Sequence, residues 1–184
     1  MIKEVNTLET RILIAGFGGQ GILFFAKYLA YIGMEKGLQV SWMPSYGPEM
    51  RGGAAQCGVV LSDNVIGNPV VGEPDIFTAM NLPSFAAFEN RVKPGGTMFV
   101  DSSLISKECS RKDITVRGIP ATQMAEEHGL KGLANMIMAG AVLSKLPDIS
   151  QDVIEAAMRE TIPERKKEMF ANNMKAVALG LAAI

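Results

Sequence analysis

Short apolar runs alternate with stretches of helical periodicity over the first two thirds of the chain. Residues Arg11–Ala15 are β-branched and aliphatic and end in glycines, which predicts a buried strand. Residues Gly19–Lys36 carry apolar residues at helical spacing, and Gly37 fits the end of that helix. Residues Gln39–Met43 predict a second strand, which Pro44 ends. Similar patterns predict strands at Ala55–Leu61, Asp75–Met80, Thr97–Val100 and Ile114–Arg117, a turn at Asp63-Asn64 before a short segment at Val65–Ile66, and a helix at Pro83–Val92.

From Ala121 onward the pattern is helical to the end, with breaks near residues 129–132, Pro147 and Pro163. Strands that alternate with helices predict an α/β fold with a single doubly wound, mostly parallel, Rossmann-like sheet, followed here by a helical C-terminal third. The chain has no internal repeat and no low-complexity segment, and its 184 residues are close to the usual size of one domain. We therefore expect residues 1–184 to form a single domain.

Two of the helical stretches, Leu133–Leu146 and Ala171–Ile184, are unusually apolar. A surface helix normally keeps one polar face, so a helix that is apolar all round is buried in a core or against a partner. For Leu133–Leu146, an ordinary core between sheet and helices explains the pattern as well as a partner does. For Ala171–Ile184 we expect a subunit contact.

Composition and charge exclude several classes of partner. The formal net charge is −1, so there is no basic excess to hold nucleic acid or an anionic membrane surface. No apolar stretch reaches the roughly 18 residues of a membrane span. The polar N-terminus lacks the apolar run of a signal peptide. We expect a cytoplasmic protein that contacts neither nucleic acid nor membrane.

The residue types that usually carry catalysis are scarce. Two cysteines, Cys57 and Cys109, are too few for the four ligands of an iron–sulfur cluster, although a disulfide between them stays open. The one histidine, His128, stands before Gly129 at what reads as a helix C-terminus, where it would complement the helix dipole. The sequence therefore predicts no catalytic residue and no metal ligand on this chain.

A glycine-rich segment at residues 16–21, GFGGQG, follows the first strand and opens the first helix. Such a turn brings backbone N–H groups close to a phosphate at a helix N-terminus. A dinucleotide site would also need an acidic residue, or an arginine for NADP, at the end of the second strand, and the sequence there is VSWMP. The glycines therefore indicate close strand–helix packing, or another anionic or subunit contact. The candidate residues are Gly16, Gly18, Gly19, Gln20 and Gly21.

The loop after the second strand, SYGPEMRGG at residues 45–53, is the more informative segment. It should lie at the carboxyl edge of the sheet beside the glycine loop, where open α/β sheets bind ligands. Arg51 suits a phosphate or carboxylate because a guanidinium forms paired hydrogen bonds, although a local pair with Glu49 would also explain it. The candidate residues in this loop are Ser45, Tyr46, Gly47, Glu49 and Arg51.

Taken together, the two segments resemble the gamma subunit of 2-oxoacid:ferredoxin oxidoreductases. The resemblance continues through Gly67–Val71, Pro74-Asp75, Asn135-Met136 and Gly140, and covers nearly the whole chain. The sequence PEMRGG followed by two alanines is similar to subunits of 2-oxoglutarate-type enzymes, and pyruvate-type relatives are less favoured.

This resemblance implies a role without a redox centre or cofactor bound by this chain alone. In that family the alpha and beta subunits hold thiamine diphosphate, and iron–sulfur clusters lie in beta or in a ferredoxin-like delta subunit. The gamma subunit packs against them and helps form the coenzyme A side of the active site. The complex converts a 2-oxoacid, coenzyme A and oxidised ferredoxin to acyl-CoA, carbon dioxide and reduced ferredoxin. The ten candidate residues would then contact coenzyme A or another subunit.

Two alternatives from other classes stay open, a free-standing NAD(P)-binding Rossmann protein and a purely structural assembly module. Within the family, indolepyruvate oxidoreductases carry a similar domain. The sequence does not identify the 2-oxoacid, the subunit stoichiometry or homodimer formation by the isolated chain.

Overall fold

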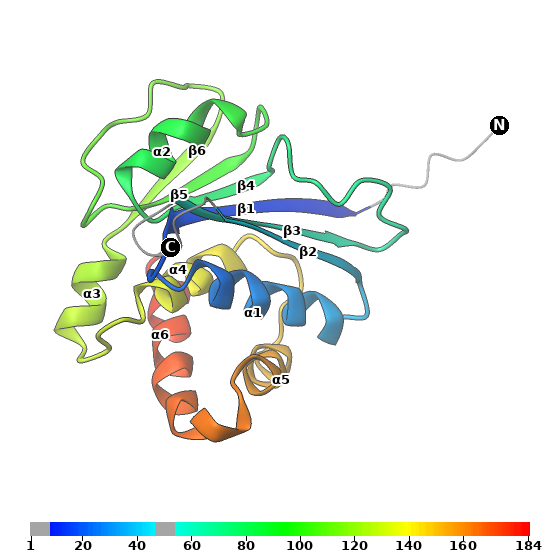
Figure 1. The fold of residues 1–184 in the computed structure, drawn as a ribbon, viewed down its shortest axis with the longest axis vertical. Helices are drawn as coiled ribbons and strands as arrows, with labels where there is room; N and C mark the ends of the chain where they lie inside the picture. The colour runs from blue at the N-terminus through cyan, green and yellow to red at the C-terminus, as the bar shows by residue number, and fades with distance from the viewer. Residues whose placement is uncertain (1–7, 47–53) are drawn as a thin grey trace.

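A computed structural model of the chain describes residues 8–46 and 54–184, without the side chain of Tyr46. These residues build one sheet with the strand order β2-β3-β1-β4-β5-β6, covered by helices (Figure 1). The strands are β1 (Glu9–Phe17), β2 (Gln39–Tyr46), β3 (Ala54–Ser62), β4 (Ile76–Ala79), β5 (Thr97–Asp101) and β6 (Thr115–Ile119). The helices are α1 (Ile22–Glu35), α2 (Leu82–Phe88), α3 (Ala121–Glu127), α4 (Ala134–Leu143), α5 (Gln151–Thr161) and α6 (Phe170–Ala182), with 3₁₀ turns η1 (Glu89–Arg91) and η2 (Glu164–Met169).

The predicted fold class is confirmed, with one strand that runs against the others. Strands β4, β5 and β6 run parallel to β1, whereas β3 is antiparallel to both β1 and β2. Only residues 47–53 connect β2 to β3, and a parallel connection needs a crossover of about a dozen residues or more. The short segment Val65–Ile66 lies in the irregular connection between β3 and β4, after a bend at Asp63-Asn64.

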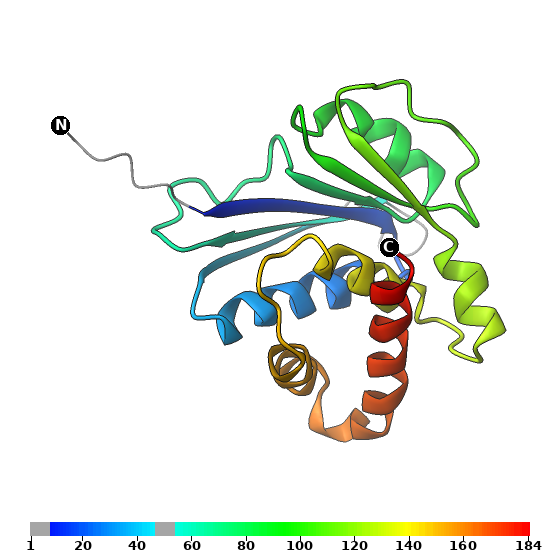
Figure 2. The same cartoon turned by 180° about the vertical axis from the view of Figure 1, so that it is seen from behind.

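Helices cover both faces of the sheet, as a doubly wound fold requires. Helices α1, α4, α5 and α6 lie on one face and α2 on the other, and α3 lies beyond one end of the strands (Figures 1 and 2). Alternate residues of β1 serve the two faces, because side chains along a strand point to opposite sides. Ile12 and Ile14 join the larger core beneath α1 and α4, and Leu13 and Ala15 join the smaller core beneath α2.

The apolar stretch Leu133–Leu146 forms an ordinary core helix. Every residue of α4 from Asn135 to Leu143 is buried. Helix α6 packs against α4 through Asn173, Ala176, Val177 and Gly180, while Ala178 and Ala182 on its other side are exposed. The subunit contact expected for the last residues therefore stays a prediction about this outer side.

The two cysteines lie on opposite faces of the sheet. Cys57 belongs to the core beneath α1, and Cys109 packs against the core beneath α2. Both are free, which answers the question of a disulfide left open by the sequence. Burial raises the pKa of the Cys57 thiol to about 12, so this thiol stays protonated and unreactive at neutral pH.

Helices α4 and α6 approach closely because each has a glycine at the crossing. A Cβ added at Gly180 would collide with the carbonyl of Ile137, and one at Gly140 with the carbonyl of Val177. We predict that Gly180→Ala lowers the free energy of unfolding by about 1–3 kcal/mol through overpacking, even though alanine favours a helix by about 1 kcal/mol. Urea unfolding of the variant measures the change.

Gly72→Ala provides the control, because a Cβ there meets no atom within 4 Å. It should leave the unfolding midpoint nearly unchanged. A Gly180→Ala variant as stable as the original chain would contradict the close crossing of α4 and α6.

Candidate functional site

The candidate site lies at the carboxyl ends of β1 and β4. The chain leaves β1 toward β2 on one side and later places β4 on the other side, so these two strands flank the topological switch point of the sheet. Open α/β sheets bind ligands in the crevice outside such a point. A cavity of about 200 Å³ lies there, between Gly19 and Gln20, Met80 after β4, and the segment from α3 to the start of α4. We call this cavity the switch crevice.

The glycines of residues 16–21 have different roles. Gly16 is buried, and a Cβ there would be 2.7 Å from both Gln20 Oε1 and Ile22 Cδ1, so this glycine serves close packing. Gly19 (φ 104°) and Gly21 (φ 73°) have left-handed backbone conformations that favour glycine. A Cβ at Gly19 would meet no atom within 4 Å, and Gly19 lines the switch crevice. Gly18 is half-buried in the same turn.

The side-chain amide of Gln20 fastens the glycine loop to the end of β4. Its Oε1 accepts hydrogen bonds from Phe17 N (2.7 Å) and Asn81 Nδ2 (3.2 Å). Its Nε2 donates to the carbonyl of Met80 at 2.8 Å. These bonds fix the distance between the ends of β1 and β4, and thus one wall of the switch crevice.

Asn135, in the first turn of α4, connects this helix to the start of α1. Its Nδ2 donates to the carbonyl of Gly21 at 3.1 Å, and the residue is only 4% exposed. Its Oδ1 is buried and has no hydrogen-bond partner among the described residues. Gly21 caps α1 and Leu133 caps α4, both without a side-chain hydrogen bond and without an acidic residue in the first turn. The N-termini of α1 and α4 therefore lie next to each other, and the start of α4, with Ala134 and Asn135, lines the crevice.

Asp101 holds α3 in place, and α3 forms another wall of the switch crevice. It is fully buried at the end of β5, where its Oδ2 accepts from Thr122 Oγ1 at 2.6 Å and its Oδ1 from Ser103 N at 3.1 Å. Glu126 and Lys131 line the crevice from α3 and from the connection to α4. Asp101, Glu126 and Lys131 were not predicted as site residues from the sequence. For Asp101 a signal existed, namely a carboxylate that directly follows an apolar strand.

The second predicted loop begins and ends next to the glycine loop. The sheet register pairs Phe17 with Ala54 and Tyr46 with Ala55, so the strand ends that flank the two loops are neighbours. Gly47, Glu49 and Arg51 lie outside the described residues, as does the side chain of Tyr46. Their predicted role as ligand or subunit contacts stays a prediction.

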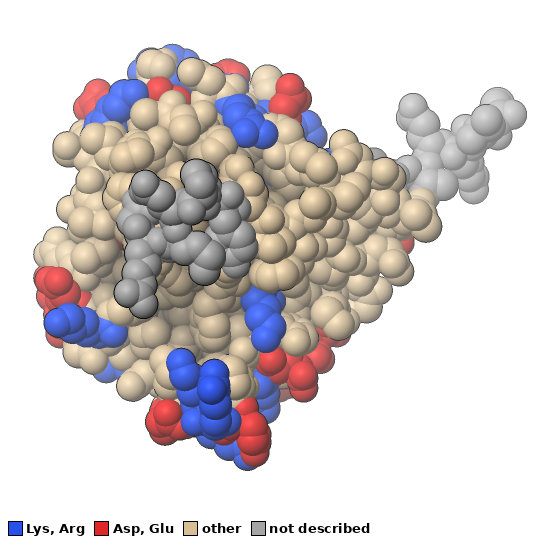
Figure 3. All heavy atoms as spheres, viewed as in Figure 1, with Lys and Arg blue, Asp and Glu red and all other residues tan. Residues whose placement is uncertain are grey.

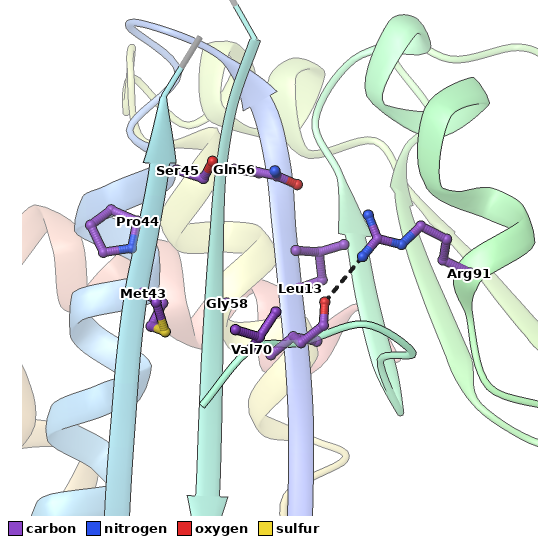
Figure 4. A pocket seen from close by; sticks show the side chains of 9 residues that line it. Leu13, Met43, Pro44, Ser45, Gln56, Gly58, Val70 and Arg91 are labelled. Carbon is purple, nitrogen blue, oxygen red and sulfur yellow. Dashed lines mark hydrogen bonds between the residues drawn. The ribbon is translucent and has the colours of Figure 1, made fainter. Parts of the chain in front are cut away.

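Ser45 lines a different hollow, on the α2 face of the sheet. This cavity of about 310 Å³ has Ser45 and Gln56 along one side and Arg91 on the other, over a floor that includes Leu13 (Figure 4). The Arg91 guanidinium donates to the carbonyls of Gly72 (3.0 Å) and Val71 (3.3 Å), which holds the β3–β4 connection against the sheet. Ser45 and the switch crevice therefore belong to separate hollows.

The described part of the chain contains no group of three or more His, Cys, Asp or Glu residues that could hold a metal ion. His128 caps the C-terminus of α3, as predicted, and its Nδ1 lies 2.9 Å from the carbonyl of Met124. Among the described residues, no helix has the length and apolar character needed to cross a membrane.

Comparisons with known proteins extend over nearly the whole chain. Residues 11–183 match the family described as pyruvate ferredoxin/flavodoxin oxidoreductase. Ketoisovalerate oxidoreductase subunit VorA from Methanothermobacter thermautotrophicus is 38% identical over 89% of this chain and 34% of its own length. This chain thus spans about a third of that relative. 2-Oxoglutarate synthase subunit KorC from Methanothermobacter marburgensis is 35% identical over 88% of this chain and 90% of its own.

Two solved structures share the fold. The gamma subunit of a keto/oxoacid ferredoxin oxidoreductase from Geobacter sulfurreducens has a TM-score of 0.80 and 26% identity, and the match covers 95% of this chain and 97% of that one. The 2-oxoglutarate:ferredoxin oxidoreductase from Magnetococcus marinus, with 2-oxoglutarate, coenzyme A and succinyl-CoA bound, has a TM-score of 0.83 and 26% identity over 95% of this chain and 31% of that one. The chain belongs to the pyruvate ferredoxin/flavodoxin oxidoreductase family.

Proposed function

We propose that this chain is the gamma subunit of a thiamine-diphosphate-dependent 2-oxoacid:ferredoxin oxidoreductase and helps form the coenzyme A side of its active site. The observation that carries the proposal is the end-to-end similarity to the KorC subunit and to a solved gamma subunit, each matched over about nine tenths or more of its own length. The complex would convert a 2-oxoacid and coenzyme A to acyl-CoA and carbon dioxide while it reduces ferredoxin.

The residues of this chain fit coenzyme A better than they fit a redox centre. Cys57 and Cys109 lie on opposite faces of the sheet and cannot ligate one iron–sulfur cluster. The uncapped start of α1 and the exposed Gly19 offer backbone N–H groups of the kind that bind phosphate. Thiamine diphosphate and the iron–sulfur clusters would then belong to the alpha, beta and delta subunits.

A partner surface is supported by apolar exposure on the edge strand β2. Trp42 and Met43 are each 41% exposed there. In Figure 3, charged side chains lie mainly at the top, the bottom and the left edge of the molecule, and the right-hand part at the level of β1–β3 carries few of them. Edge strands that expose apolar side chains are features that proteins usually cover. We propose that other subunits of the complex cover this part of the surface.

The 2-oxoacid is proposed to be 2-oxoglutarate, on the similarity to the KorC subunits. The similarity to ketoisovalerate oxidoreductase subunits is of the same order, so branched-chain 2-oxoacids belong in any substrate panel. This chain lines only one side of the proposed active site, so other subunits would recognise the 2-oxoacid side chain.

We predict that the chain, tagged at its N-terminus and isolated anaerobically from its native source, brings with it larger subunits, thiamine diphosphate and iron. Native mass spectrometry and cofactor assays check this. A panel of 2-oxoglutarate, ketoisovalerate and pyruvate, with coenzyme A and ferredoxin, then identifies the substrate. Isolation of the chain alone and free of cofactors would contradict the subunit proposal.

A second prediction concerns Arg51 and coenzyme A. In the assembled complex, Arg51→Ala should raise the KM for coenzyme A by roughly 10- to 100-fold, since a hydrogen bond to a charged group contributes about 1.5–3 kcal/mol. The KM for the 2-oxoacid should change little. Steady-state kinetics at saturating 2-oxoacid and ferredoxin measure both constants.

Arg165→Ala is the matched control, because Arg165 is an exposed arginine in η2, far along the chain from the glycine loop. Unchanged constants in an intact Arg51→Ala complex would refute the assignment to coenzyme A. A variant that assembles less completely, and whose assembled fraction keeps the original KM for coenzyme A, would support the purely structural role.

A further inference from the structure

The cavity on the α2 face of the sheet is separate from the switch crevice and has the character of a small-molecule site. Its volume of about 310 Å³ falls in the range of about 300–1,000 Å³ that such sites usually have. Its lining is mainly apolar and includes Leu13 of β1, Met43 of β2 and Val71 before β4. We infer that this cavity, which we call the Arg91 hollow, binds a short aliphatic monocarboxylate. The carboxylate pairs with Arg91, and the carbon chain lies against the apolar lining.

The guanidinium of Arg91 has one edge engaged and one edge available. Its Nε donates to the Gly72 carbonyl at 3.0 Å and its Nη2 to the Val71 carbonyl at 3.3 Å. A guanidinium has five N–H donors, so the end edge made by Nη1 and the second N–H of Nη2 is left over. This edge matches the two oxygens of a carboxylate, which it binds through parallel hydrogen bonds. None of the salt bridges among the described residues involves Arg91.

Contacts within the chain hold the guanidinium in place before any ligand arrives. Besides the two carbonyl bonds, its Cζ lies 5.2 Å from the centre of the Phe88 ring, at the end of α2. Figure 4 shows the Arg91 side chain reaching from η1 toward the strands, across the hollow from Ser45 and Gln56. A preorganised donor loses less free energy on binding than a side chain that must first be ordered.

The charge of the Arg91 hollow favours a monoanion with a carbon chain. Among the described residues that line it, Arg91 is the only charged one, and the polar residues opposite, Ser45 and Gln56, are neutral. One positive charge neutralises a monocarboxylate but leaves excess negative charge on a dianion such as phosphate. The apolar lining gains free energy from contact with a carbon chain, which an inorganic anion lacks. A short fatty acid supplies both features.

The inference does not depend on the proposed function, and the full chain is enough to test it. The experiment is a ¹³C-methyl NMR titration with hexanoate, hexanamide, acetate and inorganic phosphate, each to millimolar concentration. Hexanoate should shift the methyl groups of Leu13, Met43 and Val71 and the ¹⁵Nε signal of Arg91. Hexanamide lacks the charge and acetate lacks the chain, so each should bind roughly 10-fold more weakly or less. Phosphate should not shift the methyl groups.

Two variants of equal chemistry test the position of the site. Gln56→Glu has nearly the same shape and places a negative charge opposite Arg91, so it should weaken hexanoate binding by about 10-fold or more. Gln39→Glu is the matched control, because Gln39 is an exposed residue at the other end of β2 and does not line the hollow. It should leave the affinity unchanged. Arg91→Lys keeps the charge but loses the paired donors, and should also weaken hexanoate.

Equal affinity of Gln56→Glu and the original chain for hexanoate, or equal binding of hexanoate and hexanamide, would overturn the inference. Methyl groups that respond to assembly with other subunits but not to hexanoate would make the hollow a subunit contact instead. Displacement of hexanoate by coenzyme A would also contradict a separate carboxylate site. A chain that assembles with its partners but shows no hexanoate shifts would leave the proposed function intact and refute this site.

Discussion

The absence of side chains at Gly16 and Gly21 is the constraint that shapes the carboxyl edge of this sheet. A Cβ at Gly16 would occupy the space of Gln20 and Ile22, and one at Gly21 would collide with the side chain of Asn135. Because both positions are glycine, Gln20 can join the ends of β1 and β4, and Asn135 can join the starts of α1 and α4. The switch crevice exists between these two connections, so a residue with a side chain at either position would remove its geometry.

This arrangement explains how a chain poor in catalytic side chains can contribute to an active site. Backbone N–H groups at the starts of α1 and α4 supply positive potential without a titratable group. The positions of Cys57 and His128 fit structural roles, because Cys57 is buried in the core and His128 is the C-cap of α3. Under the proposed function, such a chain would position a substrate or a neighbouring subunit, and the chemistry would belong to the proposed partners.

Much of the fold could be predicted because the strands and helices have distinct periodicities and clear turn residues. The direction of β3 was not predicted, because the apolar pattern of a strand carries no direction; the short connection between the second and third strands is the feature of the sequence that excludes a parallel crossover. The glycine loop was recognised from the spacing of its glycines. That spacing cannot show that Gly16 allows close packing or that the Gln20 side chain joins the ends of β1 and β4. Lys131 and Glu126 were not predicted as site residues because they lie far from the glycine loop along the chain. Only the packing of α3 and α4 places them beside that loop.

Under the proposed function, the carboxyl edge of the sheet would face coenzyme A in the assembled enzyme. Hydrogen–deuterium exchange of the native complex with and without coenzyme A tests it most directly. We expect slower exchange, on coenzyme A binding, in peptides that contain residues 16–21, 45–53 and 131–135. Peptides at the opposite edge, such as residues 63–70 and 93–96, should stay unchanged. Protection at that opposite edge, or no protection of this chain at all, would contradict the account.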